Sequence, residues 1–116
     1  MKKVFIICSV RGASDEYQAK LEAYVAKLEN DGCKVHLPHR DTNQKATGIE
    51  ICKENATAIF EADEVHIYYS KTSQGTHFDM GVAFALNKTL VVVENESYGE
   101  GKSYPRMLDE WQSKCF

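Results

Sequence analysis

The chain has 116 residues, of which 43% are hydrophobic and 27% are charged, and its formal net charge is −3 at pH 7. This length and composition predict one globular domain, residues 1–116, with a core large enough to fold without disulfides or a structural metal. The acidic balance argues against a broad binder of nucleic-acid backbones, and no apolar run approaches the roughly 18 residues that cross a bilayer. We therefore expect a protein that binds neither nucleic acid nor membranes.

The start of the chain and its cysteines indicate the compartment. Residues 1–8 have a basic tip and an apolar stretch, but the stretch is short and lacks the small-residue cleavage pattern of a secretory signal. The four cysteines, Cys8, Cys33, Cys52 and Cys115, show no C-x-x-C spacing, so the sequence predicts neither a zinc ribbon nor a dithiol motif. We expect a cytoplasmic protein without a metal site.

In the first half of the chain, short apolar runs alternate with amphipathic stretches, a pattern typical of βαβ units. Residues 4–8 form a continuous apolar run and predict a central strand that is covered on both faces. Residues 14–32 predict a helix, capped by Ser14 and ended by Gly32. Residues 34–37 predict a second strand, and the polar run at residues 39–47 predicts a loop.

The second half of the chain repeats the alternation. Residues 49–60 predict an amphipathic helix, and residues 64–69 and 89–93 predict two more strands. The helix between those strands is expected to turn four side chains inward: Phe78, Val82, Ala83 and Leu86. A last helix begins near Ser103, with Pro105 in its first turn. The fold class predicted is α/β: a three-layer, flavodoxin-like or Rossmann-like domain whose parallel sheet of four to five strands has helices on both faces.

The turn after the first strand combines a hydroxyl, a guanidinium and a glycine just before a helix: Ser9, Val10, Arg11 and Gly12. In open parallel sheets, ligands bind beyond the carboxyl ends of the strands. The start of a helix presents unpaired N–H groups and partial positive charge, and Arg11 can add a bidentate contact to an anion. This turn predicts a phosphate or carboxylate seat. The alternative is an ordinary turn with a solvated arginine.

A similar turn follows the third strand, with the sequence S-Q-G-T at residues 73–76. Gly75 allows close approach to the backbone, and Thr76 can cap the helix that follows. Asp79 lies three residues after Thr76, where a carboxylate can complement a capped first turn. The alternative makes Asp79 a nucleophile toward an anomeric carbon, because a carboxylate can form a glycosyl ester that water or another base resolves.

Other polar residues lie in the loop after the second strand. His39, Arg40 and Asp41 form a cluster near the place where a base or sugar would lie, although most such clusters are solvated loops. The chain lacks G-x-x-x-x-G-K-[ST], and no G-x-G-x-x-G follows the first strand. The sequence therefore predicts neither a P-loop nor a dinucleotide cofactor.

With both turns in view, the chain resembles the nucleoside 2-deoxyribosyltransferase superfamily, and within it the branch of the 2′-deoxynucleoside 5′-phosphate N-hydrolases. The resemblance covers residues 4–108 and is clearest in S-Q-G-T-H-F-D-M-G-V-A at residues 73–83. It implies that the two turns hold a 5′-phosphate through six residues: Ser9, Val10, Arg11, Gly12, Ser73 and Gly75. It also implies that Asp79 occupies the position of the family's nucleophilic glutamate and His39 that of a site histidine.

Three positions depart from the family pattern. Asp79 is one methylene shorter than glutamate, which withdraws the carboxylate by about 1 Å. Asn55 occupies the position of a second carboxylate, and Phe5 that of a tyrosine. Aspartate still serves as the nucleophile in many glycosidases.

The resemblance implies an enzyme that cleaves or transfers the N-glycosidic bond of a (deoxy)nucleoside or its 5′-monophosphate without a cofactor. It also implies a homodimer or larger homo-oligomer, in which a neighbour's Ser103 region completes the site. The departures keep two alternatives open. One is a non-catalytic module that binds a nucleotide or phosphosugar, and the other is an accessory protein that acts by interaction.

Overall fold

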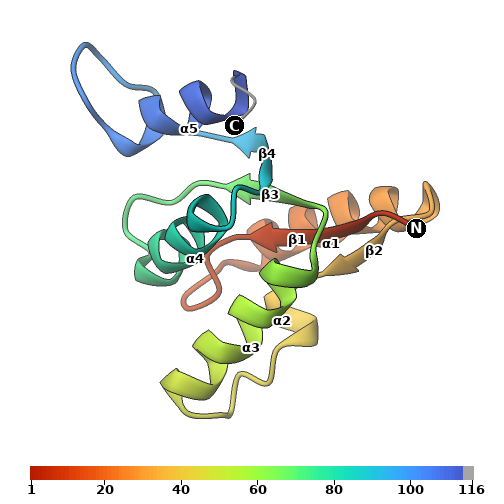
Figure 1. Cartoon of the computed structure of the whole chain (residues 1–116). Coiled ribbons are helices and arrows are strands. Elements are labelled where there is room, and N and C mark those ends of the chain that lie inside the picture. The colour runs from red at the N-terminus through yellow and green to blue at the C-terminus, as the bar shows by residue number, and fades with distance from the viewer. Residues whose placement is uncertain (114–116) are drawn as a thin grey trace.

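The computed structural model describes residues 1–113 and contains a four-stranded parallel sheet with the order β2-β1-β3-β4 (Figure 1). The strands are β1 Lys3–Ile7, β2 Lys34–His36, β3 Glu64–Tyr68 and β4 Thr89–Glu94. The helices are α1 Asp15–Asn30, α2 Pro38–Asp41, α3 Gly48–Glu61, α4 Gln74–Ala85 and α5 Tyr104–Ser113. The predicted α/β fold class is confirmed.

The two faces of the sheet pack against different helices. Val4 and Ile6 of β1 pack with Leu21 and Val25 of α1, because alternate side chains of a strand point to opposite faces. The other face carries a second core cluster, to which β1, α3, α4 and α5 all contribute: Phe5, Ile7, Ile59, Met80, Ala83, Leu108 and Trp111. In Figure 1, α3 and α4 lie on one side of the strands and α5 lies next to β4. As predicted, the first strand is central and covered on both faces.

The strand order reverses beside β1. The chain leaves β1 for its neighbour β2, then crosses back to pair β3 with the other side of β1, with Phe5 opposite both His36 and Val65. The carboxyl ends of β1 and β3 therefore lie next to each other, and α1 and α4 follow those ends. A crevice outside such a switch point is where ligands bind in open α/β sheets.

Hydroxyl side chains cap the helices that follow the ends of β1 and β3. Ser14 Oγ accepts a hydrogen bond from the N–H of Tyr17 at 3.1 Å and caps α1, as predicted. The expectation that Thr76 caps α4 was wrong, because Ser73 Oγ accepts from the Thr76 N–H at 3.1 Å. The helix therefore starts earlier than expected. Asp79 lies in its second turn, beyond the reach of a capping box.

Two other expectations need correction. The polar run at residues 39–47 is not loop throughout, because Pro38 starts the short helix α2 with its fixed φ angle. Phe78 and Leu86 do not face inward: both are exposed, Phe78 at 47%, whereas Met80 is buried. Helix α4 has apolar residues around its whole circumference, so periodicity alone could not select its buried side.

None of the helices within residues 1–113 is both long enough and apolar enough to cross a membrane.

Candidate active site

The turn between β1 and α1 is shaped by its backbone. Gly12 has a φ of 74°, which side-chain-bearing residues rarely adopt, while a Cβ there would meet nothing within 4 Å. The requirement for glycine is therefore conformational and not steric. The Val10 carbonyl accepts a hydrogen bond from the Ala13 N–H at 3.4 Å. Arg11 is exposed and forms no ion pair with any residue from 1 to 113, so its guanidinium is available to a ligand.

Asp79 is buried close to the end of β1. Its side chain is 5% exposed, and burial raises its pKa to about 7. Burial and the nearby Asp79 charge also raise the pKa of the Cys8 thiol to about 12. Cys8 directly follows β1, so the carboxylate of α4 lies close to the end of that strand. Because the Asp79 pKa is near 7, the carboxyl group changes protonation state near neutral pH.

His39 approaches the same place from α2. Its Nδ1 lies 4.0 Å from Cys8 Sγ, and its Nε2 is buried without a hydrogen-bond partner in residues 1–113. Burial lowers the pKa of His39, partly offset by a hydrogen bond to the Val10 carbonyl. The structure therefore places His39 beside the Ser9–Gly12 turn as a neutral imidazole.

The other two members of the predicted polar cluster bond to neighbouring elements. The Arg40 guanidinium bonds to Asp41 Oδ1 at 2.8 Å, to Glu29 Oε2 at 3.1 Å and to the Val35 carbonyl at 3.0 Å. These contacts tie α2 to α1 and β2. Arg40 and Asp41 therefore hold α2 in place, and the hypothesis that they also line the substrate site stays a prediction.

The turn before α4 differs from the first. Ser73 uses its hydroxyl as the helix cap, and the Thr76 hydroxyl oxygen is buried with no hydrogen-bond partner in the described part of the chain. Gly75 has no positive φ, and a Cβ built on it would meet nothing within 4 Å. Nothing in the fold itself requires glycine at position 75.

Ser103 lies at the start of α5. Its Oγ accepts a hydrogen bond from the Arg106 N–H at 3.2 Å, so the hydroxyl acts as a helix cap. The adjoining Tyr104 ring packs edge-on against His77, with ring centroids 5.0 Å apart, and His77 Nε2 lies 3.0 Å from Tyr69 Oη. The beginning of α5 therefore lies beside the first turn of α4.

Asn55 and Phe5, the two other departures from the family pattern, belong to one structural network. Thr42 donates its hydroxyl proton to Asn55 Oδ1 at 2.7 Å and accepts from His36 Nε2 at 2.8 Å. The His36 ring stacks on Phe5, with centroids 5.2 Å apart and an interplanar angle of 13°. Asn55 therefore anchors the segment after α2.

Sequence reasoning missed two residues near the end of β1, Cys8 and Tyr17. Cys8 looked like the last apolar residue of a strand, and Tyr17 like one more member of an amphipathic helix face. Tyr17 in fact accepts a hydrogen bond from the Ser9 N–H at 3.3 Å. Contacts of this kind join neighbouring elements and leave no periodic signal.

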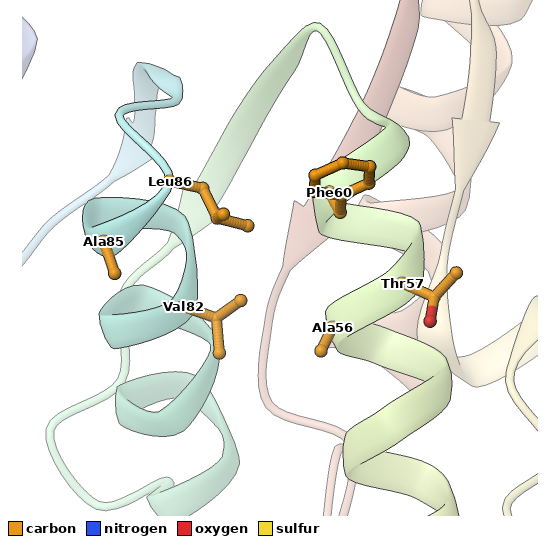
Figure 2. A pocket seen from close by; sticks show the side chains of 6 residues that line it. All are labelled: Ala56, Thr57, Phe60, Val82, Ala85 and Leu86. Atoms are coloured by element: carbon orange, nitrogen blue, oxygen red, sulfur yellow. The ribbon is translucent and has the colours of Figure 1, made fainter.

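A separate groove of about 470 Å³ lies between α3 and α4. In Figure 2, Val82 of α4 and Leu86, which directly follows α4, face Ala56 and Phe60 of α3 across it. None of its lining residues belongs to the predicted substrate site: Ala56, Thr57, Phe60, Val82, Ala85 and Leu86.

The structure is an α/β domain with a buried carboxylate, Asp79, close to the end of its central strand. The sequence model of the nucleoside 2-deoxyribosyltransferase family matches residues 6–107, and the chain belongs to this family. No curated protein matches the chain.

Several solved structures share the fold. A Clostridium botulinum CMP N-glycosidase, BcmB, is 24% identical with a TM-score of 0.65, and the match covers 94% of this chain and 81% of that one. A 2-deoxyribosyltransferase from Leishmania mexicana is 22% identical with a TM-score of 0.65, over 84% and 67% of the two chains. A conserved protein from Enterococcus faecalis is 18% identical with a TM-score of 0.67, over 94% and 73%.

Proposed function

We propose that this protein cleaves or transfers the N-glycosidic bond of a (deoxy)nucleoside or its 5′-monophosphate, with Asp79 as the nucleophile. The observation that carries the proposal is the position of Asp79: a buried carboxylate beside the end of β1, in the helix that starts from the second turn. Family membership supports the reaction class, and two structural relatives are named as an N-glycosidase and a deoxyribosyltransferase.

The two turns suit a phosphate group. Each precedes a helix whose first N–H groups carry partial positive charge, and Arg11 adds a guanidinium without an ion pair among residues 1–113. The open space in front of Gly75 lets an anion reach the backbone. The unpartnered atoms of Thr76 and His39 are polar groups that a bound ligand can satisfy.

The proposed chemistry begins with the ionised form of Asp79. A carboxylate oxygen forms a bond to the anomeric carbon C1′ while the C1′–N bond breaks, and its electron pair leaves with the base, which takes up a proton. Water or a second base then attacks C1′ and releases the carboxylate. Burial favours this role because a carboxylate with a raised pKa is a stronger nucleophile once ionised.

Base release tests the proposal directly. The purified protein is incubated with each of the common deoxynucleoside 5′-monophosphates and their nucleosides, and free base is followed by chromatography. We expect release by the wild type and none by Asp79→Ala, with Asp31→Ala as the control because Asp31 is an exposed carboxylate at the far end of α1. No release from any substrate at high protein concentration contradicts the proposal. Equal release by Asp79→Ala contradicts the assignment of the nucleophile.

A second candidate function is a non-catalytic nucleotide-binding module. The observation that favours it is the Asn55 network, in which the position of the family's second carboxylate holds an amide bonded to Thr42. This candidate predicts that nucleotides raise the melting temperature without base release, and that Arg11→Ala abolishes the shift.

We also propose that copies of the chain associate through the outer face of α3 and α4. Large apolar side chains are exposed on these helices, among them Ile49 at 68% and Phe60 at 66%. The one charged residue of α4, Asp79, is buried, so the exposed side of this helix is uncharged. Two-fold symmetry makes a surface meet itself, and the uncharged α4 side of this face is complementary to itself without repulsion. The α3 side adds exposed charges of both signs, Lys53 and Glu61.

Light scattering after size exclusion tests this surface. We expect a dimer or larger homo-oligomer for the wild type and a shift to monomer for Phe60→Glu. A monomeric wild type contradicts the proposal.

The exposed Ser103 segment is proposed to complete a neighbour's site. The free thiols of Cys8, Cys33 and Cys52 fit a cytoplasmic location.

A further inference from the structure

The Tyr17 side chain extends from the first turn of α1 to the end of β1. Its hydroxyl oxygen accepts a hydrogen bond from the Ser9 N–H at 3.3 Å. A tyrosine hydroxyl also has one proton to donate. Within residues 1–113 that proton has no acceptor. The hydroxyl, which lies against the turn that contains Arg11, can therefore still donate one hydrogen bond.

The Tyr17 ring is held in place on two sides. It packs edge-on against the buried Tyr68 of β3, with centroids 6.3 Å apart and an interplanar angle of 82°. Lys20 Nζ lies 5.6 Å from the ring centroid and is fixed by an ion pair of 2.6 Å with Glu94. A ring clamped in this way keeps the hydroxyl beside the Ser9 amide and loses little further rotamer freedom when a ligand binds.

The hydroxyl remains protonated across the working range of pH. Burial, followed by the neighbouring Cys8, raises the pKa of Tyr17 to about 12. Because the Ser9 N–H already uses an oxygen lone pair, the group facing a ligand is an O–H donor. Such a donor selects an acceptor, and the oxygens of a phosphate monoester accept hydrogen bonds and carry negative charge.

We propose that Tyr17 determines specificity for the phosphorylated substrate: its O–H donates to a phosphate oxygen of a nucleoside 5′-monophosphate seated on the Ser9–Gly12 turn. This inference rests on the proposed function. It assigns to α1 a direct substrate contact in addition to its helix N-terminus, and it makes the edge-on packing of Tyr17 against Tyr68 the support of that contact.

The test compares substrates with and without phosphate. For Tyr17→Phe, KM and kcat are measured with the deoxynucleoside 5′-monophosphate that the wild type cleaves fastest and with the matching deoxynucleoside. A lost hydrogen bond to a charged group corresponds to roughly a 10-fold to 100-fold change in binding. We expect KM for the monophosphate to rise by about that factor, with kcat and the KM of the nucleoside unchanged.

Tyr24→Phe is the matched control. It removes a hydroxyl from the same helix, one that lies 2.6 Å from His66 Nδ1 instead of on the turn. We expect it to leave the preference for the monophosphate unchanged. The melting temperature of both variants, and calorimetric titration of both with inorganic phosphate, show whether a change in KM comes from the phosphate contact or from the fold.

Each outcome has a defined meaning. If Tyr17→Phe discriminates between monophosphate and nucleoside as the wild type does, the inference about Tyr17 is wrong while the proposed function stands. If its KM rises equally for both substrates, the hydroxyl shapes the turn and the specificity role is overturned. If the wild type neither binds nor cleaves either substrate, the proposed function itself fails.

Discussion

The turns that follow β1 and β3 use glycine for different reasons. Gly12 in the first turn has a positive φ that the backbone path imposes, whereas Gly75 in the second has ordinary helical geometry with open space in front of it. The first glycine serves the fold, and we infer that the second serves a ligand. A Cβ would meet nothing within 4 Å at either position, so the difference between the two glycines lies in φ alone.

The largest expected effect comes from replacing Asp79, which lies in the helix that follows the second turn. Asp79→Asn should reduce base release by at least about 10³-fold, because the nucleophile is lost. It should also raise the free energy of unfolding by up to about 4 kcal/mol at pH 8, because it removes a buried charge. Activity assays and thermal melts of the same preparation measure both.

The sign of the stability effect depends on pH. The folded state raises the pKa of Asp79 from 3.8 to about 7, so it binds the proton more tightly than the unfolded chain does. This contribution to stability is fully present below about pH 4 and is lost as pH rises through about 7. The gain from Asp79→Asn should therefore vanish near pH 4. A gain that is independent of pH would show that Asp79 is not a buried ionisable group of this kind.

Activity should follow the same titration. If the carboxylate is the nucleophile, kcat/KM rises with pH and reaches half of its plateau near pH 7 in the free protein, where Asp79 ionises. A profile of kcat/KM between pH 5 and 9 measures this midpoint. A rate that falls over that range would instead assign Asp79 the role of an acid.

A pair of alanine substitutions tests the comparison itself. Gly12→Ala should destabilise the protein by about 1–2 kcal/mol, because alanine is strained at positive φ. Gly75→Ala should leave stability unchanged or raise it by up to about 1 kcal/mol, while its methyl group blocks the backbone and raises KM for a monophosphate at least about 10-fold. Denaturant melts measure the stability of both variants, and KM values measure how well they bind the monophosphate. Loss of stability in Gly75→Ala without a change in KM would refute the functional assignment of Gly75.

The smallest expected effect separates two arginines. Arg11→Ala should weaken monophosphate binding about 10-fold with an unchanged melting temperature, because Arg11 has no ion pair in residues 1–113. Arg40→Ala should do the reverse, since Arg40 bonds to Glu29, Asp41 and Val35. Calorimetric titration and thermal melts of the two variants measure the contrast. If both substitutions changed binding and melting temperature equally, the two arginines would have the same role.

The sequence by itself determined the order of the main elements, the central place of the first strand and the location of both turns at strand ends. Apolar runs and the Ser14 cap are local signals, and local signals are readable without coordinates. The short helix α2 was not readable in this way, because a polar run can form either a loop or one helical turn.

Only the tertiary structure decided which side of α4 is buried, which hydroxyl caps it and what the polar cluster after β2 does. A helix that is apolar all round has no preferred side until the sheet selects one, and Ser73 and Thr76 are equally good caps until the turn geometry chooses. Arg40 finds Glu29 only after α1 and α2 have packed together. Contacts between residues distant in sequence depend on how the elements pack, and that packing is decided by the fold as a whole.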